Sequence, residues 1–285
     1  MNLPTISIII PCYNHSAYVK NCLESTLVAY EGVLEVIICD DASQDSSADI
    51  IRSFIKNNER GKINYIFLQN ETNSGVCNTL NRCLKQAKHD YVYLIASDDY
   101  LCENGLTQAM LFLLEKNADA IISDCHVVNE NNEIVAESAF FDYRKSSARQ
   151  LKKNIANALV FNWVVPGPAL LLKKTVYDDI GQYDPSLMAE DRDFYLRLLS
   201  SKKNVIFNSA KVACYRIHSN NLSRTSFFKE NASAEFSLVN YKYYSEFNRL
   251  ARIYLKTYKL DISGNIVLAF YIRKLIKMLY IFLSI

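Results

Sequence analysis

The amino-acid sequence predicts an α/β fold in which a mostly parallel sheet is flanked by helices. Ile6 to Ile10 is rich in β-branched residues, and Val33 to Cys39 is a second apolar run of the same kind. Between them, Ala17 to Tyr30 places apolar residues at the spacing of an amphipathic helix. A strand, a helix and a strand in this order form a βαβ unit, and such units build parallel sheets.

The alternation of strands and helices continues along the first half of the chain. The expected elements are a helix over 45–54, a strand over 63–68, a helix over 74–87, a strand over 91–96, a helix over 106–116 and a strand over 120–123. The region that follows is less regular. It includes short strands over 169–172, 205–207 and 212–218, and a helix over 190–200. The sequence therefore predicts a Rossmann-like first half and a mixed second half.

The last sixty or so residues have a different character. Tyr and Phe are frequent there, and Tyr241 to Tyr258 has helical apolar spacing. The tail from Ile266 to Ile285 is the most apolar segment, but Arg273, Lys274 and Lys277 interrupt it too centrally for a membrane span. Two interpretations remain open for this tail, a helix lying on a membrane surface or a helix packed on the protein's own core.

Composition excludes several classes of protein. The net charge is +2 from 32 basic and 30 acidic residues, which gives no general attraction to nucleic acid. The eight cysteines form no CxxC pair, so a zinc site is not expected, and buried thiols suit a reducing cytosol. The first residues lack the basic and apolar regions of a signal peptide. We therefore expect a cytoplasmic protein.

Polar residues follow each strand of the predicted parallel sheet. These segments are Pro11 to Asn14, Asp40-Asp41, Asn70 to Gly75 and Asp98-Asp99. Open α/β sheets bind ligands at the carboxyl ends of their strands. Two adjacent carboxylates there can bind Mg²⁺ or Mn²⁺, or one can bind a metal while the other accepts a sugar hydroxyl. A solvated turn is the alternative, since Asp is common in turns.

The motifs, taken together and in order, resemble those of family-2 glycosyltransferases. These are inverting, nucleotide-sugar-dependent enzymes with the GT-A fold. The similar segments are Ile8 to Asn14, Val36 to Ser43, Asn73 to Gly75 with Asn81, Ser97 to Asp99, Ile180 to Asp184, Ala189 to Asp193 with Leu196-Arg197, and Tyr215 to His218 with Ser223. The resemblance covers about residues 5 to 224. It implies a GT-A catalytic domain over 1–225 and a helical C-terminal extension over 226–285, with a possible membrane-associating role.

The resemblance also implies roles for individual residues. Pro11, Tyr13 and Asp41 would line the nucleobase pocket beside Asp40, and Asp98 would bind the donor's ribose. Asn14, Asn73, Gly75, Asn81 and Arg216 complete the expected nucleotide-sugar site, with Arg216 neutralising charge on the leaving group. Asp99 and His218 would hold the divalent metal, Mn²⁺ or Mg²⁺. Helix caps and turns are the structural alternatives for the acidic residues.

Catalysis requires a carboxylate to deprotonate the acceptor hydroxyl. The resemblance points to Asp191 as this general base, with Glu190 as the runner-up; complementing the helix dipole is the purely structural role. Trp163, the sole Trp, is either a sugar-stacking wall for the acceptor or a core anchor. One departure concerns Ala96, where the family commonly has an Asp. It implies a weaker or differently arranged metal site, or loss of activity.

The function implied by the resemblance is transfer of a sugar from a nucleotide diphosphate sugar, with UDP favoured, to a hydroxyl of a glycan or lipid-linked glycan. Bacterial surface polysaccharide synthesis is the expected setting, in the cytoplasm or peripherally at the inner face of the plasma membrane. An inactive nucleotide-sugar-binding protein and a metal-dependent nucleotidyltransferase are the alternatives. A Rossmann oxidoreductase is excluded because no GxGxxG follows the first strand.

Overall fold

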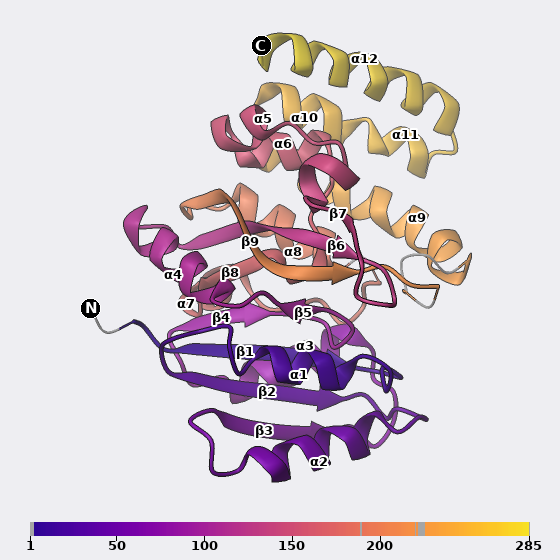
Figure 1. Ribbon diagram of the computed structural model, residues 1–285. Coiled ribbons are helices and arrows are strands. Elements are labelled where there is room, and N and C mark those ends of the chain that lie inside the picture. The colour runs from indigo at the N-terminus through magenta and orange to yellow at the C-terminus, as the bar shows by residue number, and fades with distance from the viewer. Residues whose placement is uncertain (1–2, 189, 220, 222–225, 285) are drawn as a thin grey trace. The chain divides into compact units, whose positions relative to one another are not determined.

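The computed structural model describes residues 3–188, 190–219, 221 and 226–284, without the side chains of 226–233 and 284 (Figure 1). Of the motif residues, Ala189 and Ser223 lie outside this description. The chain divides into two compact units. The first comprises Met1–Lys145, Val165–Gln182 and Lys203–His218, and the second comprises Ser146–Val164, Tyr183–Lys202 and Ser219–Ile285.

The first unit holds a nine-stranded mixed sheet in the order β3-β2-β1-β4-β8-β6-β9-β5, with β7 paired to β6. The strands are β1 (Ile6–Cys12), β2 (Leu34–Asp40), β3 (Asn64–Gln69), β4 (Tyr91–Leu94), β5 (Tyr100–Leu101), β6 (Ala120–Val128), β7 (Ile134–Ala136), β8 (Leu170–Lys173) and β9 (Val205–Arg216). The first four strands are parallel, whereas β8 runs antiparallel to β4 and β6. This is the expected α/β fold with a GT-A-like curled sheet.

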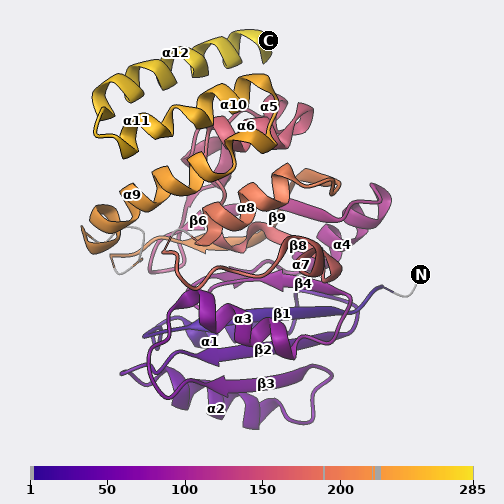
Figure 2. The ribbon, with the colours of Figure 1, turned by 180° about the vertical axis from the view of Figure 1, so that it is seen from behind.

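Helices cover both faces of the parallel half. They are α1 (Val19–Ser25), α2 (Ser47–Asn58), α3 (Val76–Gln86) and α4 (Gly105–Glu115), followed by the short elements η1 (Ala139–Tyr143), η2 (Gly167–Ala169) and α7 (Thr175–Ile180). Helices α1 and α2 lie on one face and α3 on the other (Figures 1 and 2). The apolar face of α1, with Val19, Cys22 and Leu23, is fully buried against the sheet.

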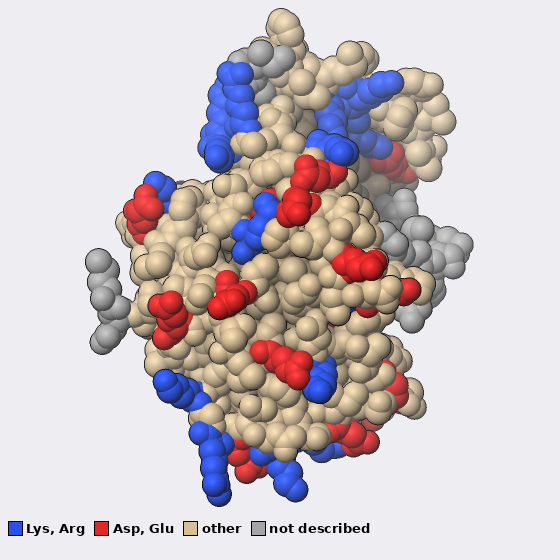
Figure 3. All heavy atoms as spheres, in the orientation of Figure 1, with Lys and Arg blue, Asp and Glu red and all other residues tan. Residues whose placement is uncertain are grey.

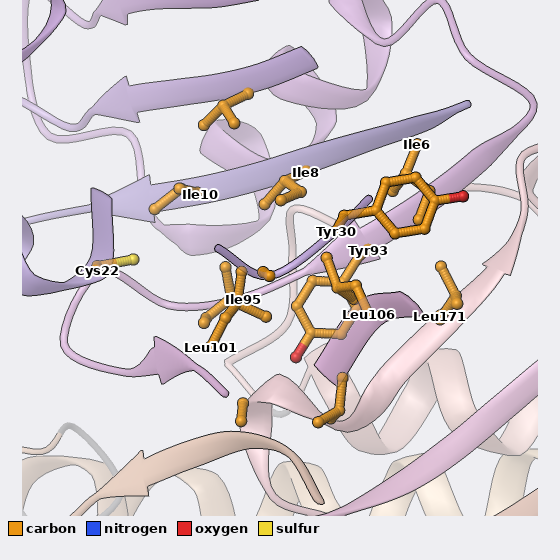
Figure 4. Packing of buried hydrophobic residues seen from close by; sticks show 14 of the residues in the cluster. Ile6, Ile8, Ile10, Cys22, Tyr30, Tyr93, Ile95, Leu101, Leu106 and Leu171 are labelled. Atoms are coloured by element: carbon orange, nitrogen blue, oxygen red, sulfur yellow. The ribbon is translucent and has the colours of Figure 1, made fainter. Parts of the chain in front are cut away.

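The core explains why β1 lies at the centre. Ile6, Ile8 and Ile10 alternate along β1 and are fully buried, so they pack on one face of the sheet with Tyr93 of β4 and Leu106 of α4 (Figure 4). The intervening residues are buried as well, which is typical of a strand covered on both faces. Burying an Ile side chain stabilises a fold by roughly 1.5–3 kcal/mol. The parallel half is therefore a rigid platform for the loops at its carboxyl edge.

The second unit is helical. Its elements are α5 (Ala148–Lys153), α6 (Ile155–Phe161), α8 (Glu190–Ser200), α9 (Ser226–Lys242), η4 (Tyr244–Glu246), α10 (Arg249–Lys256), α11 (Tyr258–Ile262) and α12 (Ile266–Ser284). Within the described residues, no helix is both long enough and apolar enough to cross a membrane. The expected division at residues 225 and 226 stays a prediction.

Several expected elements differ from the structure. The two strands expected over 205–207 and 212–218 form one strand, β9, because β6 pairs with it through shifts of register near Asp124. Strands β5 and β7 were not predicted, because strands of two and three residues are too short to show a sequence pattern. The helix expected over 241–258 is broken at η4, and α10 starts anew at Asn248, whose Oδ1 accepts a hydrogen bond from the backbone N–H of Ala251.

Candidate active site

The polar segments after the parallel strands are tied side by side in the first unit. The backbone N–H of Asp41 donates to the carbonyl of Cys12 at 2.8 Å, and that of Asn70 donates to the carbonyl of Asp40 at 2.8 Å. The N–H of Ser97 likewise donates to the carbonyl of Pro11. These bonds extend the sheet pairing beyond the strand ends, so the segments expected to bind a nucleotide do meet at one edge.

Asp40 and Asp41 are adjacent, but they have different partners. Asp41 is fully engaged, since its two oxygens accept hydrogen bonds from Asn70 Nδ2 and from the backbone N–H groups of Ser74 and Gly75, at 2.6–2.9 Å. Asp40 is completely buried, and its Oδ1 accepts from the N–H of Ser43. Its Oδ2 has no hydrogen-bond partner among the described residues. The oxygen with capacity for a ligand thus belongs to Asp40.

Asp41 therefore shapes the loop that enters α3. Gly75 precedes this helix with φ of +83°, a conformation that favours glycine, and Asn73 Oδ1 also accepts from its N–H at 3.2 Å. Asn81 lies half-buried on α3 itself. The structure brings Asp41, Asn73 and Gly75 together at the loop, whereas Asn81 is placed on the helix that follows it.

The end of β1 contacts the loop after β2. The Asn14 backbone N–H donates to Ser43 Oγ at 2.9 Å, and its Oδ1 accepts from the N–H of Gln44 at 2.7 Å. Pro11 is half-buried, whereas 43% of Tyr13 is exposed. An exposed aromatic ring such as that of Tyr13 suits stacking on a flat ligand.

Asp98 lies with two histidines. Its Oδ2 is 3.0 Å from His218 Nε2 and 3.9 Å from His15 Nε2. Burial alone would raise the pKa of Asp98, but the hydrogen bond to His218 and the nearby imidazoles outweigh it and lower the pKa below its ordinary value. One ligand atom from each of the three residues lies within 4.8 Å of the others. One carboxylate and two imidazoles are a suitable donor set for a divalent transition metal.

His15 was not foreseen from the sequence. Its Nδ1 lies 2.8 Å from Ser97 Oγ, which orients the ring so that Nε2 faces Asp98. Burial lowers the pKa of His15 below its ordinary value, so the ring is neutral and able to ligate at neutral pH. A lone His after a strand gives no signal on its own; only the pairing of β1 with β4 brings it to Asp98.

Asp99, which we expected to bind the metal with His218, is not among these three residues. Its side chain is buried, and its Oδ1 accepts a hydrogen bond from the backbone N–H of Arg216 at 2.7 Å. Burial and the charge of Asp98 raise the pKa of Asp99 well above its ordinary value. Adjacent residues in an extended turn point in different directions, which separates the two carboxyls.

Arg216 is buried as well, and its guanidinium is occupied by the chain. It donates to the carbonyls of Asp98, Asn129 and Glu130, and to the side-chain oxygens of Asn21 and Asn132, at 2.6–3.4 Å. The structure thus places it beneath the Asp98 turn, where it holds neighbouring segments together. We expected Arg216 to contact the leaving group, but the hydrogen bonds of its guanidinium favour a structural role.

The second unit carries the expected base at the start of α8. Asp191 is exposed, and its Oδ1 accepts the N–H of Arg192 at 2.5 Å. Glu190 is half-buried; desolvation and the charge of Asp191 raise its pKa to about 8. Desolvation by surrounding protein also raises the pKa of Asp191, in spite of its exposed surface. Asp191 is thus the more accessible of the two carboxylates.

The next residue of α8, Arg192, fixes this helix in place. Arg192 is buried and donates to Asn240 Oδ1 and to the carbonyls of Leu159 and Val160. Its guanidinium lies 4.9 Å from the ring centroid of Trp163, which is half-buried. Trp163 therefore has a packing role, and a stacking role toward an acceptor stays a prediction.

Comparison with known proteins decides the family. The family model for glycosyl transferase family 2 matches residues 7–178, which is more than half of the chain. The chain belongs to glycosyl transferase family 2. The enzyme class expected from the sequence, a glycosyltransferase, is confirmed. The match ends before α8 and His218, so the roles of Asp191 and His218 rest on other arguments.

Two named relatives are similar in sequence to this family-2 glycosyltransferase. The glycosyltransferase GlyG of Streptococcus pneumoniae is 24% identical over 228 residues, covering 78% of this chain and 74% of the relative. Poly-beta-1,6-N-acetyl-D-glucosamine synthase of Staphylococcus epidermidis is 29% identical over 191 residues, covering 65% of this chain and 43% of the relative. The chain thus matches less than half the length of that synthase.

Solved structures confirm the GT-A-like fold. Residues 1–349 of Staphylococcus aureus TarS in complex with UDP-GlcNAc superpose with a TM-score of 0.67 at 21% identity, covering 92% of this chain and 72% of the other. The mannosyltransferase PcManGT of Pyrobaculum calidifontis, in complex with GDP-Man and Mn²⁺, gives a TM-score of 0.61 at 14% identity, covering 86% of this chain and 64% of the other. At these identities the likeness concerns the fold.

Proposed function

We propose that this glycosyltransferase moves a sugar from a UDP-sugar to a hydroxyl of a glycan or lipid-linked glycan, with inversion at the anomeric carbon. The observation that carries the proposal is a pair of groups at one sheet edge, the buried Asp40 oxygen that has no partner among the described residues and the group of His15, Asp98 and His218. The base of a nucleotide diphosphate would bind at Asp40. Its diphosphate would bind a cation held by His15, Asp98 and His218.

The nucleobase choice is argued from hydrogen bonding. Asp40 Oδ2 is buried and accepts only, so it suits a base with a ring N–H, such as the imide of uracil. Cytosine lacks a hydrogen on the equivalent ring nitrogen. The complex of TarS with UDP-GlcNAc supports the same nucleotide, and the named product of the Staphylococcus epidermidis relative supports an N-acetylhexosamine as the sugar.

Asp98, His218 and His15 would hold the divalent cation, and their two imidazoles favour a transition metal such as Mn²⁺ over Mg²⁺. The donor set fits, because Asp98 is ionised at neutral pH and both imidazoles face its carboxylate. When bound, such a cation neutralises the negative charge of a diphosphate leaving group. His15 supplies a third protein ligand in a chain where Ala96 replaces an Asp common in the family.

We assign the general base to Asp191. Its carboxylate would take the proton of the acceptor hydroxyl as the oxygen attacks the anomeric carbon, while the bond to the diphosphate breaks and its electron pair leaves with the phosphate oxygen. Attack from the face opposite the leaving group inverts the configuration. Glu190, with a pKa of about 8, is largely protonated at neutral pH and is a poorer base. Arg192 keeps Asp191 at a fixed position on α8.

The acceptor and the cellular setting are further parts of the proposal. A relative named as a poly-beta-1,6-N-acetyl-D-glucosamine synthase supports a growing polysaccharide as acceptor. We place the enzyme in the cytoplasm, peripherally at the inner face of the plasma membrane. Within this proposal, residues 1–225 form the catalytic domain and 226–285 a C-terminal extension. The alternatives are an inactive nucleotide-sugar binder and a nucleotidyltransferase.

Calorimetry with UDP, GDP, CDP and dTDP, each with Mn²⁺ and then with EDTA, tests the donor class. We expect selective binding of UDP that weakens in EDTA. Incubation with UDP-GlcNAc and an oligosaccharide acceptor, followed by NMR of the product's anomeric proton, then tests transfer and inversion. Binding without any transfer would favour the inactive binder, and absence of nucleotide binding under either condition would refute the proposal.

A further inference from the structure

Helix α12 turns its charged side chains toward the protein. Arg273 donates to both carboxylate oxygens of Asp261 at 2.6 and 3.0 Å, and its guanidinium lies 4.3 Å from the ring centroid of Tyr258. Lys277 Nζ donates to Asn162 Oδ1 at 3.0 Å, and burial lowers the pKa of Lys277. Two of the three cations that interrupt this apolar segment are therefore engaged within the helical unit.

The same face of α12 is anchored by packing. Ala269 and Tyr280 are buried, and the Tyr280 ring stacks on Phe161 with centroids 4.2 Å apart. Residues 269, 273, 277 and 280 follow one another at steps of three or four, so they share one side of the helix. The orientation of α12 about its own axis is thus set by specific contacts.

The outward face of α12 is apolar along the helix, apart from the exposed Lys274. Val267, Leu275 and Phe282 are 71%, 66% and 75% exposed. The other exposed apolar residues of this helix are Ile266, Leu268, Phe270, Tyr271, Met278, Leu279, Ile281 and Leu283. From 267 to 282 the stripe is about 22 Å long at 1.5 Å per residue. Single exposed apolar residues are ordinary, but a continuous stripe of this size indicates an interaction surface.

The surroundings of the stripe are basic. Residues 242–285 contain eight Lys and Arg residues but only two acidic ones, in a chain whose net charge is +2. Arg252 and Lys256 of α10 and Lys259 of α11 are exposed, and both helices pack against α12. Figure 3 shows Lys and Arg side chains in this part of the molecule with few acidic ones beside them.

The apolar stripe and the cations beside it together favour one kind of binding partner over another. A second copy of the chain would bring the same cations to the interface, and like charges repel. A membrane with anionic lipids offers the opposite charge at its surface and an apolar interior beneath it. An in-plane helix needs both properties, an apolar face to insert and cations at the level of the phosphates.

We propose that α12 lies in the plane of an anionic membrane, with its Val267, Leu275 and Phe282 stripe inserted below the headgroups. Lys274, Arg252 and Lys256 then lie at the level of the lipid phosphates, with the Lys274 stem extending along the apolar surface. The inference deepens the proposed peripheral location. It does not depend on the donor chemistry at Asp98.

The test is cosedimentation of the full chain with vesicles of phosphatidylcholine alone and of equal parts phosphatidylcholine and phosphatidylglycerol. We expect at least about tenfold stronger binding to the anionic vesicles. The double variant Leu275→Ser/Phe282→Ser should lose at least about tenfold of this binding, since both side chains are exposed and would no longer insert. Leu111→Ser, at an exposed apolar position of α4, is the matched control and should bind as wild type.

A second readout reports insertion directly. Trp163 is the sole Trp, so the difference between Phe270→Trp and wild type isolates emission from position 270. We expect a blue shift on adding anionic vesicles. Absence of vesicle binding, equal binding of wild type and the double variant, or a dimer in light scattering that the double variant abolishes would each overturn the proposal. Calorimetry with UDP on the same variants shows whether they still bind the nucleotide. Failure of the membrane proposal can then be distinguished from failure of the proposed function.

Discussion

The carboxylate of Asp98 lies 3.0 Å from Nε2 of His218, although 120 positions separate the two residues along the chain. The contact arises because β5 pairs with β9, which brings the segment after β4 to the end of the last strand. His15, at the end of β1, completes the group. Three segments that are remote in sequence thus contribute one side chain each to a single small volume.

Removal of His15 tests this group. His15→Asn should lower Mn²⁺ affinity by at least about tenfold, because one of three protein ligands is lost. The measurement is calorimetry with Mn²⁺ in the absence of nucleotide. His89→Asn, outside this group of residues, serves as the matched control and should leave the affinity unchanged. Wild-type Mn²⁺ affinity in His15→Asn would remove the residue from the site.

Asp99 should behave as a structural residue. Asp99→Asn keeps an oxygen that accepts the N–H of Arg216, so we expect unchanged Mn²⁺ affinity and unchanged or higher stability. Asp99→Ala leaves that buried N–H without a partner and should cost about 1–3 kcal/mol in the free energy of unfolding. Denaturant unfolding, together with the Mn²⁺ titration, measures both effects. Loss of Mn²⁺ binding in Asp99→Asn would restore Asp99 as a ligand.

Asp40 should set nucleobase choice. Asp40→Asn offers an amide N–H as well as an oxygen, so UDP affinity should fall by about tenfold or more and the preference over CDP should narrow. Competition calorimetry with the two nucleotides gives the ratio. Asp49→Asn, at an exposed acidic position of α2, controls for the change in net charge. An unaltered UDP-to-CDP ratio in Asp40→Asn would count against base recognition by this carboxylate.

Asp191→Asn should abolish transfer while nucleotide binding stays intact. Removing a general base lowers kcat by about 10²–10⁴. The comparison uses initial rates with UDP-GlcNAc beside UDP calorimetry on the same preparation. Glu190→Gln is the neighbouring control and should retain most of the activity. Full turnover by Asp191→Asn would move the base elsewhere.

Glu190 should give the fold a pH-dependent stability. Its pKa is raised from 4.5 to about 8, so between these values the folded chain keeps a proton that the unfolded chain has lost. Its contribution to the free energy of unfolding is therefore present below pH 4.5 and declines as the pH rises toward 8. Glu190→Gln should be more stable than wild type by about 1–2 kcal/mol at pH 8, allowing for solvent screening, and equal to it at pH 4. Thermal unfolding at both pH values tests this; an advantage that does not change with pH would contradict it.

The periodic parts of the fold could be predicted from the sequence. The strands of the parallel half and α8 were found because burial imposes a period of two or a continuous apolar run on strands, and 3.6 on helices. The ligand-binding edge, at the carboxyl ends of the parallel strands, could also be predicted because it follows from the order of strands and helices in the sequence. Side-chain direction within the turns could not be predicted, so the sequence did not reveal that Asp98 rather than Asp99 lies beside His218, or that Asp40 rather than Asp41 has an oxygen without a partner among the described residues. Such directions depend on tertiary partners such as Arg216 and Gly75, which no local pattern reveals.

The hydrogen bonds of the Arg216 guanidinium connect several loops near the site. They affect how freely the sequences of these loops can vary. Among the acceptors named above, three are backbone carbonyls, those of Asp98, Asn129 and Glu130. A carbonyl is present whichever side chain the residue bears, so the contacts to positions 129 and 130 of the hairpin between β6 and β7 tolerate other side chains there, whereas the contact to Asn132 requires its side-chain oxygen. Lysine, with a single point of charge, could not span these acceptors. Side chains at positions 129 and 130 can therefore be replaced without removing the hydrogen bonds that Arg216 makes to their backbone.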